Sequence, residues 1–190
     1  MAEARDLPLF RWGEELRRTR ARRSRLRRRA ALAAAVVAAL AATVVAPPAP
    51  RLLWNASASA PLGLYWVRPD ASLAVGDMVV AHAPARARAL AARRGYLPLG
   101  VPLVKRVAAA QGSVVCARAD LLSVDRKPLA LRRRADRTGR PLPWWEGCRI
   151  LGEGELLLLM AERPDSFDAR YFGVTEPGEV VGKAVLLWRR

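Results

Sequence analysis

A short serine segment and an isolated lysine are the residues of this chain whose types and setting best suit catalysis. Ser57 and Ser59 alternate with alanines just before a Pro-Leu-Gly-Leu-Tyr sequence, and Lys105 follows the apolar run Pro-Leu-Val. A serine hydroxyl becomes a nucleophile when a neighbouring base removes its proton. A lysine can be this base if burial keeps its amine neutral. These residues indicate nucleophilic catalysis by a serine with Lys105 as general base, whereas a Lys105 pointing into solvent beside Arg106 would have no such role.

The composition favours a lysine base over the other candidates. Thirty of the 33 basic residues are arginine, and a guanidinium does not deprotonate usefully, so an arginine could not replace Lys105 as a base. His82 is the only histidine and no recognisable motif surrounds it, so we expect a strand residue rather than a member of a Ser-His-Asp triad. His82, Cys116 and Cys148 are too scattered to form a zinc site, and we expect neither a metal nor a cofactor.

The N-terminal third reads as a basic tail followed by a membrane anchor. Residues 1–29 contain eleven arginines and four acidic residues, and residues 30–46 carry no charge before Pro47-Pro48. A helix over 30–46 would be about 25 Å long, slightly short of a hydrocarbon core of about 30 Å. Snorkelling of Arg27–Arg29 and the apolar Leu52–Trp54 beyond the prolines would extend the span. The sequence predicts a basic cytoplasmic tail at 1–29, a transmembrane anchor at 30–48 and a β-rich domain at 49–190.

Two other interpretations of the apolar segment stay open. A cleaved signal peptide has the same order of charged and apolar residues, but its basic region would be unusually long and no convincing small-residue cleavage site precedes the prolines. A buried soluble helix fits poorly, because the Ala-rich stretch has no polar face. The anchor interpretation predicts a single-pass protein of the inner (cytoplasmic) membrane. Its arginine-rich N-terminus would stay in the cytoplasm against anionic lipid, and its C-terminal domain would be periplasmic.

From Leu64 onward the pattern of apolar residues becomes that of short strands. One short helix is expected at residues 85–95, closed by Gly95, and a basic loop containing Pro and Trp at 132–147. The sequence therefore predicts a mainly β fold behind a single N-terminal transmembrane helix. The expected strands are Leu64–Arg68, Leu73–His82, Val101–Ala109, Gly112–Ala117, Leu121–Val124, Pro128–Leu131, Leu156–Met160 and Val180–Trp188.

Two cysteines flank an expected hairpin and the basic loop. In an oxidising compartment Cys116 and Cys148 could pair and hold this part of the domain together. A bond that closes a loop of this size contributes roughly 3–4 kcal/mol in the chain-entropy model. The alternative is a pair of free, buried thiols.

Three ordered motifs resemble those of the signal peptidase I superfamily (serine peptidase family S26), most closely its TraF-like conjugative-transfer branch. Asn55–Tyr65 matches the motif N-x-S/T-x-S-x-P-x-G-L-Y, and the resemblance implies that Ser59 is the nucleophile. Ser57 matches the position whose hydroxyl joins the backbone N–H of Ser59 in an oxyanion hole. The Lys-Arg-Val sequence matches the general-base segment, which implies that role for Lys105.

The third motif, S-x-D-x-R-Y-F-G, matches Ser166–Gly173. The resemblance implies that Ser166 orients the lysine amine and that Asp168 and Arg170 form a supporting pair. It also implies a signal-peptidase-like β domain with an extended groove, in which the substrate binds as an added strand, and a preference for small residues just before the cut. The implied partners are membrane lipid and an exported pre-protein or pro-pilin.

The resemblance predicts a membrane-anchored serine endopeptidase that cleaves signal or pro-peptides, with maturation of a conjugative pilin or another exported transfer protein as its expected role. The residues do not distinguish hydrolysis of the acyl-enzyme from aminolysis that would close the product into a ring. The alternative is a non-enzymatic, membrane-anchored component of a transfer or secretion machine that binds nucleic acid or partner proteins. The net charge of +16 and the basic residues at 132–140 suggest it, although the basic tail fits a topology signal better than a nucleic-acid arm.

Overall fold

The N-terminal part of the chain forms one long helix. The structure, a computed structural model, describes residues 8–45 and 50–190. Helix α1 (Pro8–Val45) runs without interruption through residues that the sequence divides into a tail and an anchor. Its stretch Trp12–Val45 contains an apolar segment long enough to cross a membrane, and none of that segment is buried. The end predicted at Pro47-Pro48 lies outside the described residues.

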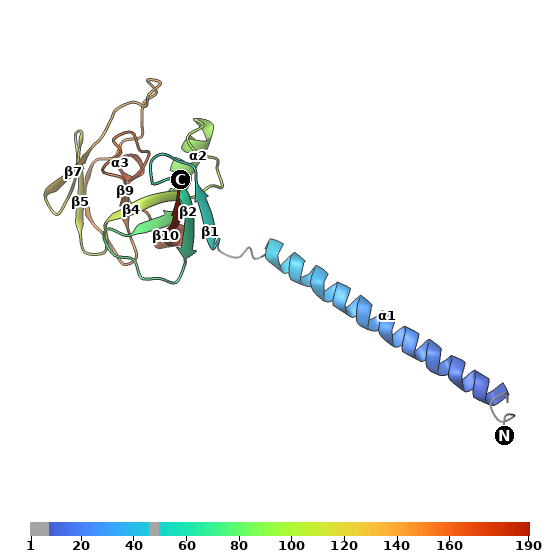
Figure 1. Cartoon of the computed structure of the whole chain (residues 1–190). Coiled ribbons are helices and arrows are strands. Elements are labelled where there is room, and N and C mark those ends of the chain that lie inside the picture. The colour runs from blue at the N-terminus through green and yellow to red at the C-terminus, as the bar shows by residue number, and fades with distance from the viewer. Residues whose placement is uncertain (1–7, 46–49) are drawn as a thin grey trace. The chain divides into compact units, whose positions relative to one another are not determined.

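The described residues 50–190 form a separate unit built on two antiparallel sheets, which confirms the mainly β fold. The larger sheet has the order β1-β2-β10-β3-β4-β9 (Figure 1). The last strand, β10, lies between β2 and β3, so the end of the chain joins the two halves of this sheet. The strands are β1 (Leu52–Asn55), β2 (Gly63–Arg68), β3 (Met78–Ala81), β4 (Leu103–Ala109), β9 (Leu157–Leu159) and β10 (Val180–Arg189).

The smaller sheet has the order β7-β6-β5-β8. Cys116 on β5 lies opposite Cys148 on β8, and the two form a disulfide bond. The sequence does not predict β8. All four of its residues are exposed, so the strand has no buried face that would require a recognisable pattern of apolar residues. The strands are β5 (Val114–Arg118), β6 (Leu121–Val124), β7 (Lys127–Leu131) and β8 (Gly147–Ile150).

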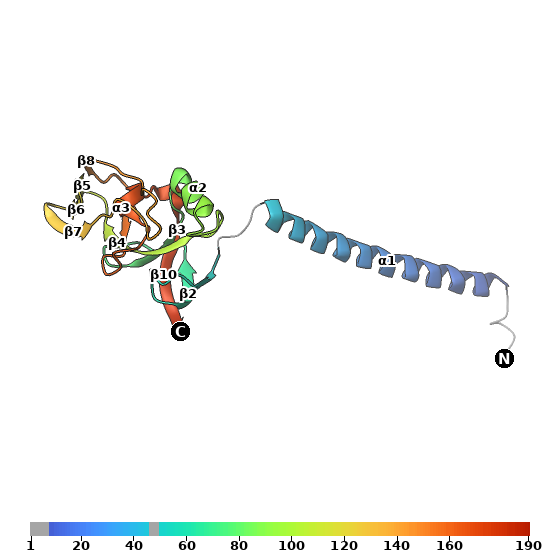
Figure 2. The same cartoon turned by 90° about the horizontal axis from the view of Figure 1, so that it is seen from above.

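Short helices fill the space around the sheets. Helix α2 (Ala85–Arg93) ends slightly earlier than the sequence predicts, and α3 (Ala169–Phe172) is a single turn that the sequence does not predict. Figure 2 shows α3 between the smaller sheet and β3. Ala169 belongs to the same buried cluster as Leu122 of the smaller sheet and Leu157 of the larger one, so α3 connects the two sheets. A 3₁₀ turn, η2 (Pro177–Glu179), leads into β10.

The strands of the larger sheet differ from the predicted ones by one or two residues at several ends, as at β4 and β9, and by more at two places. Leu52–Trp54 reads as an apolar extension of the anchor, but its backbone pairs with β2 as strand β1. Strand β3 begins at Met78, later than predicted, because a turn precedes it. Gly76 has a φ of +96°, and the carboxylate of Asp77 accepts the N–H of Ala74 at 2.9 Å. An Asp side chain that bonds to a nearby backbone N–H favours a turn over a strand.

Removal of the disulfide should destabilise the domain. Replacing both cysteines by serine, Cys116→Ser with Cys148→Ser, should lower the free energy of unfolding by about 3–4 kcal/mol, because the bond spans 32 residues and restricts the unfolded chain. Denaturant titration of the double variant measures this loss, with the reduced wild-type chain as the matched comparison. An unchanged midpoint in both would show that the bond contributes nothing.

Candidate active site

The loop between β1 and β2 presents Ser57 and Ser59, and the buried side chain of Asn55 fixes its shape. The Asn55 amide nitrogen donates to the carbonyl oxygens of Ser57, Ala60 and Pro61 at 3.0–3.2 Å. Its Oδ1 accepts the N–H of Ser57 at 3.0 Å. One buried amide therefore holds both ends of the turn that carries Ser59.

The loop ends at Gly63, where a side chain has no room. Gly63 has a φ of +147°, and a Cβ there would lie 2.0 Å from the carbonyl oxygen of Trp188 on β10. Two residues later, the hydroxyl of Tyr65 donates to the carbonyl oxygen of Pro61 at 2.8 Å. The Gly and Tyr of the first motif thus allow β2 and β10 to approach closely and hold the far end of the loop.

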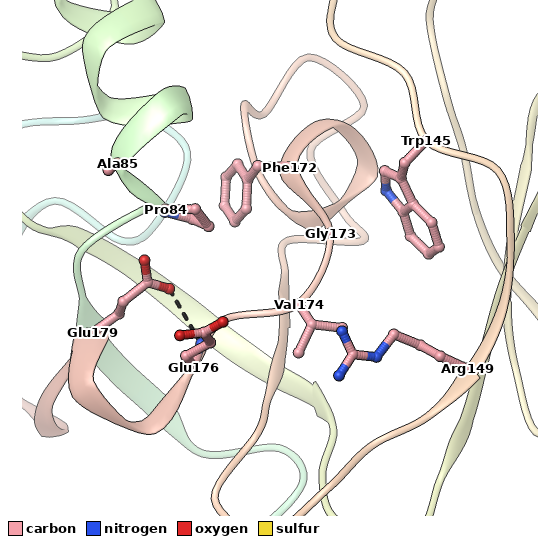
Figure 3. A pocket seen from close by; sticks show the side chains of 9 residues that line it. All are labelled: Pro84, Ala85, Trp145, Arg149, Phe172, Gly173, Val174, Glu176 and Glu179. Carbon is pink, nitrogen blue, oxygen red and sulfur yellow. Dashed lines mark hydrogen bonds between the residues drawn. The ribbon is translucent and has the colours of Figure 1, made fainter.

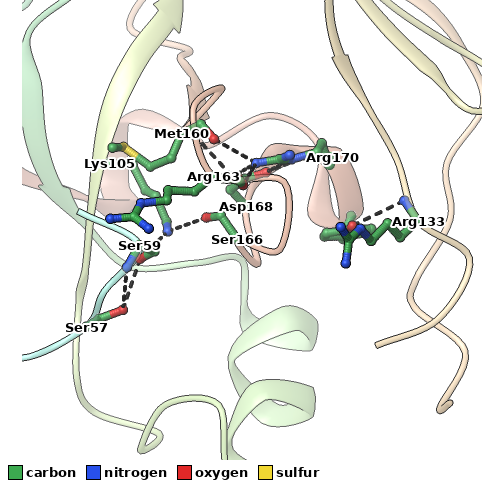
Figure 4. Close-up of polar contacts among 10 residues, drawn as sticks. Ser57, Ser59, Lys105, Arg133, Met160, Arg163, Ser166, Asp168 and Arg170 are labelled. Carbon is green, nitrogen blue, oxygen red and sulfur yellow. Dashed lines mark hydrogen bonds and ion pairs between the residues drawn. The ribbon is translucent and has the colours of Figure 1, made fainter. Parts of the chain in front are cut away.

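Lys105 reaches this loop from inside the larger sheet (Figure 4). It lies on β4, opposite Val79 on β3, and is 1% exposed. Its Nζ lies 2.9 Å from Oγ of Ser59 and 2.7 Å from Oγ of Ser166. Ser166 is buried, whereas Ser59 is partly exposed. The amine is therefore held between two hydroxyls, of which the one on Ser59 is open to a substrate.

A buried ion pair shapes the turn that carries Ser166. Arg170 and Asp168 pair at 2.8 Å, with side chains that are 1% and 0% exposed. Arg170 also donates to the carbonyl oxygens of Met160 and Arg163 at 2.8 and 2.7 Å, and Asp168 accepts the N–H of Met160 at 3.2 Å. Because each charge has a partner and further hydrogen bonds, the pair can remain in the core. It thereby fixes the backbone on either side of Ser166.

The surroundings of Lys105 favour its neutral form. Burial is the main reason that the pKa of Lys105 falls from 10.5 to about 8. The carboxylate of Asp168 opposes this fall, and the guanidinium of Arg170 adds to it. About half of the amine is then neutral at pH 8, and a neutral amine can accept a proton from a neighbouring hydroxyl.

Ser57 places a second hydroxyl beside Ser59. Its Oγ lies 3.0 Å from Oγ of Ser59 and accepts the N–H of Ser59 at 3.4 Å. A hydroxyl and a backbone N–H therefore lie next to the oxygen that Lys105 can activate. Such donors can stabilise the negative charge that develops on the carbonyl oxygen of a substrate when the serine attacks it. For this, the Ser57 hydroxyl would have to turn from Ser59 toward that carbonyl oxygen.

These groups open into a groove of about 670 Å³, lined by Ser57, Ser59, Lys105 and Ser166 among others. A second hollow of about 500 Å³ has a different character (Figure 3). Its described lining residues include no serine, cysteine, lysine or histidine. Its Glu179 carboxylate accepts the N–H of Glu176 at 3.1 Å. The side chains that suit nucleophilic chemistry by a serine therefore line the groove and not the second hollow.

The structure brings the three motifs together and keeps the other candidates apart. His82 follows β3, and neither it nor the Cys116–Cys148 bond lines the groove. Across residues 12–45 and 50–190, no three His, Cys, Asp or Glu side chains lie close enough to hold a metal ion. The sequence analysis does not predict that Asn55 holds the serine loop. The position of an asparagine between an apolar run and the two serines is the signal that indicates this role.

The chain is similar to proteins of one family. Residues 25–189 match the family model described as signal peptidase, peptidase S26. A plasmid transfer protein TraF of Escherichia coli is 33% identical over 147 residues, which cover 70% of this chain and 82% of that protein. A probable conjugal transfer protein TraF of Sinorhizobium fredii is 34% identical over 142 residues, 68% of this chain and 73% of that protein. A solved signal peptidase I of Enterococcus faecalis V583 has 20% identity and a TM-score of 0.36, and the match covers 60% of this chain and 97% of that one.

Removing the buried amine should stabilise the fold. A protonated amine whose pKa falls to about 8 costs about 3 kcal/mol to bury. Lys105→Met fills similar space without charge, but the hydroxyls of Ser59 and Ser166 lose a partner, so the net gain at pH 7 should be about 1–3 kcal/mol. The gain is full below pH 8 and disappears as the pH rises toward 10.5, where the unfolded lysine is also neutral.

Denaturant titrations between pH 6 and 11 measure this gain. Lys127→Met is the matched control, since Lys127 is exposed, and it should change the stability little at any pH. A Lys105→Met variant that is less stable than wild type throughout this range would contradict the burial argument.

Proposed function

Because the chain belongs to the signal peptidase family, peptidase S26, we propose that it is a membrane-anchored serine endopeptidase that works through a Ser59–Lys105 dyad. The observation that carries this proposal is the 2.9 Å contact between the Lys105 amine and the Ser59 hydroxyl in a groove. The burial of the amine supports the same assignment, because a lysine can act as a base only in its neutral form.

In the proposed reaction the Ser59 hydroxyl donates to the neutral amine of Lys105, and its oxygen attacks the scissile carbonyl carbon as the proton passes to the amine. The ammonium then gives this proton to the leaving amine, the C–N bond breaks, and an acyl-enzyme on Ser59 remains. Water attacks the acyl carbon with Lys105 again as base, which releases the product and restores the hydroxyl. Ser166 accepts a hydrogen bond from the amine throughout and keeps its lone pair directed at Ser59.

The oxyanion that forms in each half of this reaction needs donors close to Ser59. The backbone N–H of Ser59 and the hydroxyl of Ser57 fit this role, because both are donors that lie beside the nucleophile. The N–H donates to the Oγ of Ser57 at 3.4 Å, and each group would exchange its present hydrogen bond for one to the oxyanion. A single donor of this kind typically contributes about 3–4 kcal/mol to stabilisation of the transition state. Asn55 keeps the two serines in place and acts as a positioning residue.

The proposed substrate is an exported precursor, and the names of the TraF relatives favour a protein used in plasmid transfer, such as a pilin subunit. Hydrolysis of the acyl-enzyme would release a shortened chain. Attack by the substrate's own amino group in place of water would join its ends, and the same dyad can serve either outcome.

The proposed location is the inner membrane, with the basic end of α1 in the cytoplasm and the peptidase domain in the periplasm. The apolar helix and the family support membrane anchoring, and a disulfide suits an oxidising compartment. The outer face of β1, β2 and β10 also exposes large apolar side chains, as expected of a surface that rests on lipid. They include Leu52, Trp54, Trp66, Val185 and Trp188, all more than a third exposed.

Loss of either member of the dyad should abolish cleavage. Ser59→Ala and Lys105→Ala should each lower the rate by about 10⁴-fold or more, since neither residue acts without the other. The measurement is conversion of an exported precursor by the purified, detergent-solubilised chain, with denaturant titration to show that each variant is folded. Ser123→Ala and Lys127→Ala, on the smaller sheet, are matched controls and should remain active. Cleavage by pure Ser59→Ala would remove the assignment.

Activity should depend on the neutral fraction of Lys105. With the pKa of Lys105 at about 8, kcat/KM should rise about tenfold per pH unit below pH 8 and level off above it. Lys105→Arg should stay inactive at every pH, because a guanidinium does not lose its proton. Initial rates on one peptide between pH 6 and 9.5 test this. A flat profile over that range would argue against a lysine base.

A further inference from the structure

The groove around the dyad has a charge pattern that the proposed mechanism does not use. Besides Lys105, its lining contains four arginines and two aspartates. The rest of the lining is largely apolar or aromatic. The charged residues are Arg133, Arg137, Arg140, Arg163, Asp136 and Asp165.

Two of the four arginines neutralise the two aspartates. Arg137 forms an ion pair with Asp165, and Arg140 pairs with Asp136 at 2.7 Å. Asp136 also accepts the hydroxyl of Tyr96. The pKa of each aspartate is lowered although burial acts in the opposite direction. Hydrogen bonds from Tyr96 and Arg140 favour the charged form of Asp136, whereas its own backbone N–H and the charges of Arg137 and Arg133 favour that of Asp165. Both carboxylates are therefore already engaged within the protein.

The other two arginines of the groove, Arg133 and Arg163, are exposed and have no carboxylate within ion-pair distance in the described part of the chain. The groove thus carries an excess of positive charge with room for a ligand beside it. A guanidinium in this setting binds a carboxylate through two parallel hydrogen bonds.

Arg163 is better placed than Arg133 to bind a carboxylate of a substrate near Ser59. Its carbonyl oxygen accepts the N–H of Ser166 at 3.0 Å and a guanidinium N–H of Arg170 at 2.7 Å, so its backbone is fixed by the same network that holds the dyad. Figure 4 shows its side chain extending to the side of Lys105 and Ser59, and all three line the groove. A cation held on this turn therefore faces a substrate close to the reacting carbonyl.

We propose that the groove selects substrates that carry an acidic side chain within about three residues of the scissile bond, with Arg163 as the specificity-determining residue and Arg133 as a second contact. An extended chain advances about 3.3 Å per residue, so a carboxylate at that separation comes within reach of a long arginine side chain beside Ser59. This inference rests on the proposed function, because it takes Ser59 as the point of cleavage.

Paired peptides test this subsite. The probes are fluorescence-quenched, Ala-rich peptides with a small residue before the cut, each with Glu, Gln or Lys at one of the three positions on either side. The detergent-solubilised full chain should cleave the Glu peptide about tenfold faster, by kcat/KM, at one position or more. In Arg163→Gln this Glu/Gln ratio should fall close to one, and Arg163→Glu should prefer a Lys peptide to the Glu peptide.

The ratio is measured within each variant, so partial loss of folded protein cannot imitate the effect. Arg134→Gln is the matched control, because Arg134 lies outside the groove lining and pairs with Asp120 at 3.4 Å, and it should keep the wild-type ratio. A wild-type ratio of one at every position, or an unchanged ratio in Arg163→Gln, overturns the subsite alone. A wild-type chain that cleaves none of the peptides overturns the proposed function and the subsite with it.

Discussion

The site depends on the amine of Lys105, which the larger sheet buries and which burial makes harder to protonate. Lys105 is 1% exposed, and the free energy of burying an ammonium is what lowers its pKa to about 8. A nearby carboxylate could have reversed this effect. Asp168 does oppose it, but Asp168 shares its charge with Arg170, whose guanidinium acts on Lys105 in the other direction. The ion pair can therefore shape the turn around Ser166 without holding a proton on the lysine.

The rest of the domain serves to bring three separate parts of the chain to that amine. Asn55 folds the serine loop between β1 and β2, and Gly63 lets β10 pack against β2 at the end of this loop. Strand β4 carries Lys105, flanked by β3 and β9. The polar network of Arg170 supplies Ser166 and, on the same turn, Arg163. The proposed proton transfer and the proposed recognition of substrate charge would thus share one rigid support, which suits a site that needs exact distances.

The sequence is sufficient for the fold class, because the apolar residues after Leu64 alternate as in short strands and three motifs resemble those of a family with a β domain. It is not sufficient for elements that lack such a pattern. Strand β1 is four residues long and follows the apolar helix in sequence. Its composition fits either an extension of the apolar segment or a strand, and its pairing with β2 shows that it is a strand. Strand β8 is wholly exposed and forms opposite β5 with the disulfide across the pair. The hydrogen bonds of Asn55 and the direction of Arg163 belong to irregular turns held by partners within seven residues. Such turns have no periodic pattern of apolar residues from which a sequence predicts their shape.

Direct titration of the Lys105 amine is the most direct test of this account. The chain has three lysines, so selective ¹⁵N labelling of lysine gives a simple NMR spectrum, and the resonance lost in Lys105→Met identifies the amine. The account predicts that this resonance in the detergent-solubilised full chain titrates with a midpoint of about 8. A midpoint at or above 10.5, the ordinary value for lysine, would mean that the amine is protonated at neutral pH and would contradict its proposed role as the base.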